Sequence, residues 1–180
     1  MNFIMRIIGC AAGSRLGRTV LPWVASHRIR VLGGSMYPLL HPGEIVLCHR
    51  LAYCAGQRAS RGDIVLFKHP AGPSGRMIKL IAGLPGEQIE VRNDRLWIND
   101  RALQFHTPMV GSLPGRWKLT ANELFVLSYA VAVGTDSRTF GPIEQEQVLG
   151  KVWYLLPPSA RKGRLDSVQM SLSDNEKRPQ

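Results

Sequence analysis

Acidic side chains are missing from the start of this 180-residue chain, where the first one is Glu44. The arginines of the same stretch are Arg6, Arg15, Arg18, Arg28 and Arg30. Long apolar runs are missing too, because "IIGCAAGS" (7–14) and "TVLPWVAS" (19–26) fall far short of the ~20 apolar residues of a membrane-spanning helix. We therefore expect no spanning helix, and a basic leader over residues 1–28, helical or irregular. Peripheral contact with an anionic membrane surface and a solvated arm are its two alternative roles.

Cysteine is scarce, and its three positions, Cys10, Cys48 and Cys54, form no Cys-x-x-Cys pair. No pair of histidines stands at zinc-finger spacing either. We interpret the cysteines as free thiols, and we expect neither a metal nor a cofactor. The net charge of +10 is compatible with nucleic acid, with an anionic membrane or with a soluble basic protein.

Short strands between turns dominate the rest of the chain, and no long helical periodicity occurs after residue 30. In "EQIEVRNDRLWIND" (87–100), alternating apolar residues flank Asn93-Asp94, which predicts a hairpin. The pattern predicts an all-β fold, a barrel or coiled sheet, over residues 29–156. After Pro158 the apolar content falls, so residues 157–180 are predicted to be a mobile tail. The other expected strands lie in "RIRVLG" (28–33), "HPGEIVLCHRL" (41–51), "RGDIVLFKHP" (61–70), "RMIKLIAGL" (76–84), "ELFVLSYAVAVG" (123–134) and "VLGKVWYLLPP" (148–158).

Ser35 lies in "GGSMYPLL" (33–40), between two glycines and a methionine. Its hydroxyl is a nucleophile only where a neighbouring group accepts the proton. Histidine is the usual base, but His41 and His69 stand beside prolines, and the other histidines lie in polar or irregular contexts. Nothing in the sequence supports a Ser-His-Asp triad.

Lys79 is the better candidate for the base. It is the one charged residue of the apolar run "MIKLIAGL" (77–84), and a period of two places it on one face with Met77 and Ile81. Desolvation lowers the pKa of a lysine, and a neutral amine can accept a proton from serine. The alternative is a lysine that extends to solvent at a sheet edge.

These segments, in this order, resemble the signal peptidase I family of membrane-associated serine proteases. The resemblance covers about residues 29–156 and is carried by "GSMYPLL", "RGDIVLFKHP", "IKLIAGLPGEQIEV" and "GTDSRTFGPI". It implies Ser35 as nucleophile, Lys79 as general base, a coiled-sheet fold and a precursor protein as substrate. "RIRVLGGSMYPLLHPGEIVL" also resembles the branch that matures nickel-type superoxide dismutase, and the sequence leaves the branch open.

The resemblance also implies supporting positions around the nucleophile, namely Gly33, Gly34, Met36, Asp136 and Arg138. We expect Met36 to pack below Ser35, and Asp136 and Arg138 to form a structural ion pair. The oxyanion hole would be built from backbone N–H groups, chiefly that of Ser35. The turns at 42–44 and 62–63 are expected only to begin strands.

Four positions depart from the family pattern. Gly33 stands where bacterial members often carry an oxyanion hydroxyl, and Leu39 replaces a threonine. Leu80 replaces an arginine, and Gly134 occupies the place of the serine that orients the lysine, with Thr135 as the neighbouring hydroxyl.

Three functions compete. The first is an endopeptidase that removes a signal or leader segment through an acyl-enzyme on Ser35. The second, motivated by the hydroxyls missing at positions 33 and 134, is an inactive β-domain that binds peptide or an anionic membrane. The third, a self-cleaving repressor, ranks last, because the residues before Ser35 are too few and too glycine-rich for a helix-turn-helix. No nucleic-acid partner is therefore expected.

Overall fold

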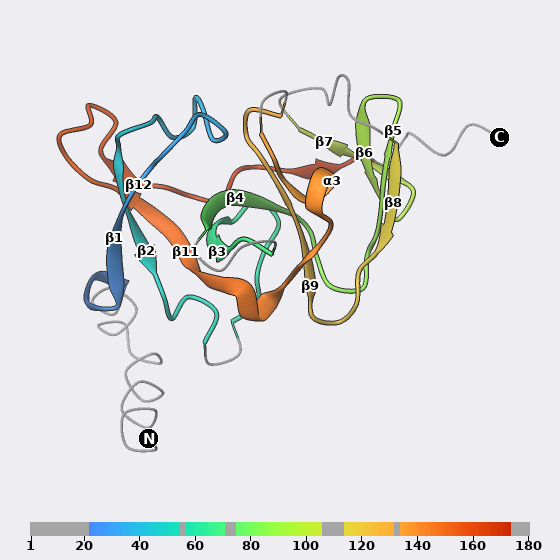
Figure 1. The fold of residues 1–180 in the computed structure, drawn as a ribbon, viewed down its shortest axis with the longest axis horizontal. Helices are drawn as coiled ribbons and strands as arrows, with labels where there is room; N and C mark the ends of the chain where they lie inside the picture. Colours follow the sequence, from blue (N-terminus) through green and yellow to red (C-terminus); the bar gives the residue numbers. More distant parts are fainter. Residues whose placement is uncertain (1–21, 55–56, 71–74, 106–113, 132–133, 174–180) are drawn as a thin grey trace, which may run out of the picture.

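The computed structural model describes residues 22–54, 57–70, 75–105, 114–131 and 134–173. Antiparallel strands form two sheets, with the larger sheet on the left of Figure 1 and the smaller one on the right. The described residues include little helix: one turn at 22–24, α3 (Ser137–Phe140) and the 3₁₀ turn η1 (Gln145–Gln147). The all-β fold predicted from the sequence is confirmed.

The larger sheet has the strand order β1-β2-β11-β3-β4-β9-β10, and β12 pairs with β11 at its side. Its strands are β1 (Ser26–Arg30), β2 (Ile45–His49), β3 (Ile64–Lys68), β4 (Arg76–Gly83), β9 (Glu123–Leu127), β10 (Ile143–Glu144), β11 (Val148–Leu155) and β12 (Gly163–Arg164). The smaller sheet has the order β13-β7-β6-β5-β8. Its strands are β5 (Gln88–Arg92), β6 (Arg95–Ile98), β7 (Arg101–Gln104), β8 (Gly115–Lys118) and β13 (Ser171–Leu172).

The hairpin predicted at residues 87–100 is formed by β5 and β6. Asn93 and Asp94 connect the two strands with φ of +50° and +55°, which suits the tight turns of two-residue hairpins. Ile89 pairs with Ile98, and Val91 with Leu96, on the buried side. The alternation in the sequence was therefore sufficient to give the register.

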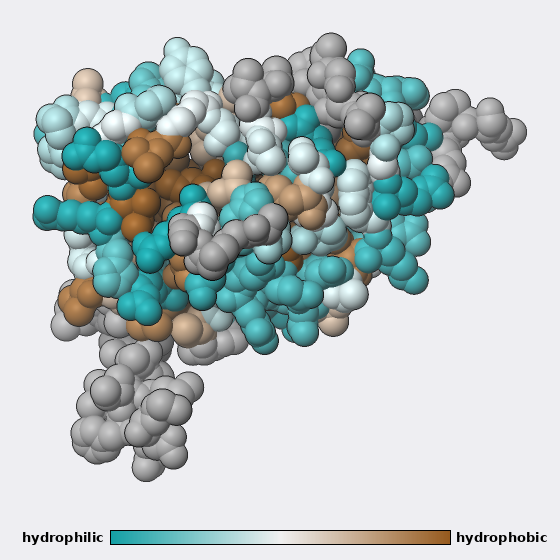
Figure 2. All heavy atoms as spheres, in the orientation of Figure 1, coloured by the Kyte–Doolittle hydropathy of each residue, from teal (hydrophilic) through white to brown (hydrophobic). Residues whose placement is uncertain are grey.

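Strand β4 buries both of its faces. Ile78 and Leu80 pack in one core cluster with Met36 and Leu66, whereas Met77 and Ile81 pack in another. The two-face assignment made from the sequence is confirmed. Figure 2 shows apolar side chains gathered over the larger sheet on the left of this view, while the surface on the right is mostly hydrophilic.

Two strand boundaries differ from the expectation. Strand β1 begins at Ser26, inside the stretch assigned to the leader, and it pairs with β2 from there. Strand β9 ends at Leu127 instead of continuing to residue 134. The chain leaves the sheet there because the next N–H groups find other acceptors: Ser128 N donates to Asp136, and Ala130 N donates to the carbonyl of Ser35.

Residues 157–173 form strands and hydrogen bonds with both sheets, where the sequence predicted a mobile tail over 157–180; residues 174–180 lie outside the described part. Strand β12 pairs with β11, and β13 pairs with β7, so this segment joins both sheets. Between them, Val168 N donates to the carbonyl of Gly62 at 2.8 Å. A Cβ at Gly62, whose φ is +85°, would meet the carbonyl oxygen of Val168 at 1.9 Å, so glycine is needed for this approach.

Polar side chains in two turns hold the same segment. Asp63, which is buried, accepts hydrogen bonds from Lys151 and Ser167, each at 2.6 Å, and from Tyr53 at 2.9 Å. Glu44 accepts from Ser159 at 2.8 Å. The turns at 42–44 and 62–63 therefore do more than begin strands, because each supplies a carboxylate that anchors the C-terminal segment.

Candidate active site

Ser35 lies in a loop that β1 and β2 close at its base. Val31 N donates to the carbonyl of Glu44, and Gly43 N donates to the carbonyl of Val31, both at 2.8 Å. We call residues 32–40 the Ser35 loop. Met36 and Leu40 are buried and anchor the loop in the core, while Ser35 itself is half-buried. Met36 is thus part of the core, and its packing below Ser35 stays a prediction.

The two glycines before Ser35 are exposed. Gly33 has φ +80°, a left-handed conformation that residues with a Cβ rarely adopt, so a serine at this position would be strained. The departure from the family pattern at Gly33 is thus matched by a backbone that favours glycine.

Lys79 is buried in the middle of β4, with 1% of its surface exposed. It pairs with Val65 of β3, and the next residue, Leu80, pairs with Leu127 of β9. Burial lowers the pKa of Lys79 to about 8; the charge of Asp136 opposes this shift and that of Arg138 adds to it. With this pKa, about a tenth of the amine is neutral at pH 7, far more than a solvent-exposed lysine with the ordinary pKa of 10.5 would provide.

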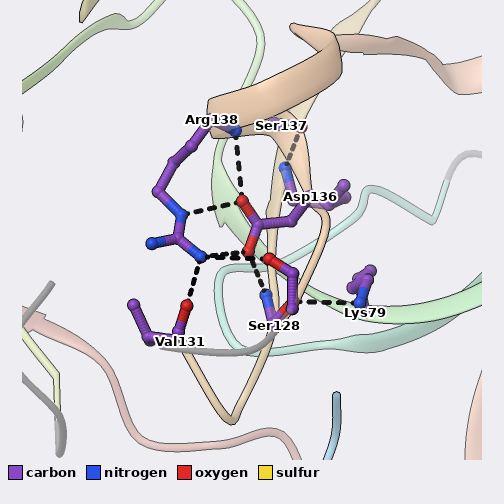
Figure 3. Close-up of polar contacts among 8 residues, drawn as sticks. Lys79, Ser128, Val131, Asp136, Ser137 and Arg138 are labelled. Carbon is purple, nitrogen blue, oxygen red and sulfur yellow. Dashed lines mark hydrogen bonds and ion pairs between the residues drawn. The ribbon is translucent and has the colours of Figure 1, made fainter. Parts of the chain in front are cut away.

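The amine of Lys79 donates a hydrogen bond to Ser128 Oγ at 2.9 Å (Figure 3). Ser128 is itself fixed, because its N–H donates to Asp136 Oδ2 at 2.9 Å. Asp136 is fully buried and forms an ion pair with Arg138, whose Nε and Nη2 each lie 2.8 Å from a carboxylate oxygen. Arg138 also donates to the carbonyl of Val131 at 2.7 Å. These contacts join the end of β9 to the start of α3, next to the amine of Lys79.

Ser128 is a candidate site residue that the sequence reasoning missed. The position of the lysine-orienting serine was assigned to Gly134, and no hydroxyl was expected there. In the structure a Cβ built on Gly134 would lie 1.8 Å from Ser128 Oγ, so the Ser128 side chain occupies the space of a side chain at 134. The hydroxyl beside Lys79 is present, supplied from the end of β9, and Thr135 is not its source. The signal available in the sequence was a lone serine that ends an apolar strand.

The backbone of the Ser35 loop lies next to this arrangement. Ala130, two residues after Ser128, donates its N–H to the carbonyl of Ser35 at 2.9 Å. Met36 and Leu80, the neighbours of Ser35 and Lys79 in the chain, belong to one core cluster. The described hydrogen bonds include none between Ser35 Oγ and Lys79 Nζ. Catalytic hydrogen bonds often form fully only when substrate is bound.

The described residues contain no group of three or more His, Cys, Asp or Glu side chains that could hold a metal ion. Cys48 and Cys54 are free thiols, and Cys10 lies outside the described part. No helix in the described ranges is long and apolar enough to cross a membrane. Residues 1–21 of the predicted leader also lie outside those ranges.

An all-β fold with a serine loop beside a buried lysine has the components of a serine peptidase. The family model described as signal peptidase, peptidase S26, matches residues 3–156, so the chain belongs to this family and is a hydrolase of the serine peptidase class. The resemblance noted from the sequence is confirmed at the level of the family.

Individual relatives are distant. The chain is 28% identical over 148 residues to signal peptidase IB of Staphylococcus aureus, covering 71% of this chain and 76% of the relative. It is 29% identical over 140 residues to signal peptidase I V of Bacillus subtilis, covering 68% and 81%. A crystal structure of a signal peptidase I from Enterococcus faecalis matches with a TM-score of 0.46 and 26% identity, covering 53% of this chain and 97% of that one.

Proposed function

We propose that the protein is an endopeptidase that removes a signal or leader segment from a precursor protein, with Ser35 as nucleophile and Lys79 as general base. The observation that carries the proposal is the burial of Lys79 in the strand beside the Ser35 loop, with its pKa lowered to about 8. Membership in the S26 family supports the reaction class.

The reaction begins when the neutral amine of Lys79 takes the proton of Ser35. The serine oxygen attacks the carbonyl carbon of the scissile peptide bond, and the resulting ammonium gives its proton to the departing amine. The neutral amine then deprotonates a water molecule, whose oxygen attacks the ester carbonyl carbon of the acyl-enzyme. The bond to Ser35 Oγ breaks, the ammonium returns its proton to that oxygen, and the acyl group leaves as a carboxylic acid. Ser128 accepts a hydrogen bond from the amine and so fixes its direction. The backbone N–H of Ser35 is the first candidate donor to the oxyanion, with Gly33 and Gly34 keeping its surroundings open.

Exposed apolar side chains beside the nucleophile favour an apolar peptide as substrate. Leu32 is 83% exposed and Tyr37 is 53% exposed, and both belong to the Ser35 loop. An extended leader segment with small residues at the cleavage point would cover these side chains while its carbonyl reaches Ser35. Which precursor is cleaved, including one of the nickel-type superoxide dismutase branch, stays a prediction, as does peripheral contact with an anionic membrane.

The test is cleavage of a leader peptide with small residues at the cleavage site by Ser35→Ala and Lys79→Met separately. We expect both variants to lose activity by several orders of magnitude while they remain folded. Lys118→Met, at an exposed position of β8, is the matched control and should cleave at the wild-type rate. Full activity in either of the first two variants would refute the Ser/Lys dyad.

The alternative, an inactive domain that binds peptide or membrane, rested on two missing hydroxyls. One of them is replaced, since Ser128 provides a hydroxyl to Lys79. Covalent labelling of Ser35 by a β-lactam-type acylating probe separates the two functions. A chain that binds the leader peptide but never labels at Ser35 would favour the inactive domain.

A further inference from the structure

One arginine fastens the Ser35 loop to a distant part of the chain. Arg161 lies in the turn after β11, and its Nη1 donates to the carbonyl oxygens of Pro38 at 2.8 Å and Leu39 at 3.3 Å. Its Nη2 donates to both carboxylate oxygens of Glu44, at 2.8 and 2.9 Å. A single guanidinium therefore joins the far side of the loop to Glu44, whose backbone closes the loop at its base.

Glu44 is a firm attachment point. Its carboxylate also accepts from the N–H of His41 at 2.7 Å and from Ser159 Oγ at 2.8 Å. Burial acts to raise the pKa of Glu44, but the hydrogen bonds from His41, Arg161 and Ser159 outweigh it and bring the pKa below its usual value. The carboxylate is thus ionised at neutral pH, and each hydrogen bond to it is strengthened by its charge.

On the opposite side of the loop, buried Met36 packs in the core, and the described backbone hydrogen bonds from outside the loop include one, from Ala130 to the carbonyl of Ser35. The segment before Ser35 offers little support, since Leu32, Gly33 and Gly34 are exposed. A displacement of about 1 Å at a reacting group can lower the rate roughly 100-fold. The polar contacts of Arg161 hold the loop three and four residues after the nucleophile, so their loss would allow the loop to shift.

We propose that Arg161 is a positioning residue that holds the Ser35 loop in the geometry for attack, so that the C-terminal segment forms part of the catalytic apparatus. The inference rests on the proposed function of Ser35. Lysine at this position would not reproduce it, because a single ammonium cannot reach two carbonyls and two carboxylate oxygens as a planar guanidinium does.

The test compares Arg161→Ala and Arg161→Lys in the full chain. Arg164→Ala is the matched control, because it removes an arginine of the same segment. Arg164 Nε lies 3.4 Å from a carboxylate oxygen of exposed Asp166, and Arg164 has no described contact with the Ser35 loop. For each variant kcat and KM for the leader peptide, the rate of Ser35 acylation by a β-lactam-type probe, and Tm are measured. All rates are taken well below the Tm, so that unfolded protein does not contribute.

We expect Arg161→Ala to lower kcat and the acylation rate by about 10-fold or more, with a smaller change in KM. Arg161→Lys should fall between Ala and wild type, and Arg164→Ala should stay within about 2-fold. The pH midpoint of activity should not move, because Lys79 and Ser128 are untouched. A variant Arg161→Ala with a lower Tm but rates equal to those of Arg164→Ala would overturn the inference. If Ser35→Ala and Lys79→Met keep full activity, the proposed function fails instead.

Discussion

The substitution Lys79→Met tests the physical basis of the proposed site, since methionine fills a similar volume without a charge. In the folded chain the amine has 1% of its surface exposed and a pKa of about 8, against an ordinary value of 10.5. The unfolded chain therefore binds more protons than the folded one between pH 8 and 10.5. The contribution of Lys79 to the free energy of unfolding should accordingly rise with pH across this window, and the methionine variant should lack this contribution.

The magnitude follows from the two pKa values. Each pKa unit corresponds to 1.36 kcal/mol, so well below pH 8 the charged, desolvated lysine costs about 3 kcal/mol of stability. Between about pH 7 and 9.5, about 2 kcal/mol of this cost disappears as the folded amine loses its proton. Over the same range kcat/KM of the wild type should increase and level off above about pH 8, because only the neutral amine accepts the serine proton.

Urea unfolding of wild type, Lys79→Met and the control Lys118→Met at pH 7 and pH 9.5 measures this difference. The stability of wild type relative to Lys79→Met should rise by about 2 kcal/mol between the two pH values, while the control should follow wild type. A relative stability that is independent of pH would mean that Lys79 is hydrated or stays charged. The argument that makes it a base would then be wrong.

Four further predictions concern the residues around the lysine and the C-terminal segment. Ser128→Ala should lower kcat about 10- to 100-fold, since it removes a hydrogen bond to the base worth roughly 1.5–3 kcal/mol, and peptide cleavage measures it. The double variant Ser128→Gly/Gly134→Ser should recover part of that activity. Gly134→Ser alone should destabilise the fold, because its Cβ would lie 1.8 Å from Ser128 Oγ. A double variant no more active than Ser128→Ala would contradict this reasoning. Asp136→Asn should lower Tm and kcat together, because the buried acceptor of Ser128 N and partner of Arg138 loses its charge. Burial acts to raise the pKa of Asp63, but the hydrogen bonds from Lys151 and Ser167 outweigh burial and lower it. The stability that the Asp63 carboxylate contributes is therefore present at neutral pH and is lost as the pH falls through this lowered pKa. Asp63→Asn should cost about 3 kcal/mol at pH 7 and flatten the acid side of the stability curve in urea unfolding; an unchanged curve would refute this.

The sequence predicted the sheets because apolar alternation and turn residues carry their information locally. The hairpin at Asn93-Asp94 and the two faces of β4 follow from side chains within a few positions of one another. The same reasoning singled out Lys79, since a charge inside an apolar run is visible without any tertiary contact. It could not predict how far Ser35 lies from Lys79. The placement of Ser35 beside Ala130 depends on tertiary structure, namely on where the strands bring their ends.

The C-terminal segment was misread for a physical reason. Hydrophobicity was the criterion for order, but this segment is held largely by polar contacts to two turns, with Arg161 on Glu44 and Ser167 on Asp63. Carboxylates in turns are usually solvated, and nothing local to Glu44 or Asp63 indicates that they accept hydrogen bonds from residues about 100 positions away.

Ser128 shows why a motif position and a position in space must be kept apart. The family pattern assigns the hydroxyl to residue 134, and glycine there suggested a defective site. Yet Ser128 N donates to Asp136 and Arg138 donates to the carbonyl of Val131, so that the end of β9 and Gly134 approach the same volume. Within that volume only one side chain fits, and a hydroxyl from Ser128 requires that residue 134 have none. Glycine at 134 is therefore the complement of serine at 128 and no sign of lost activity, and the two positions should be read together in any relative of this chain.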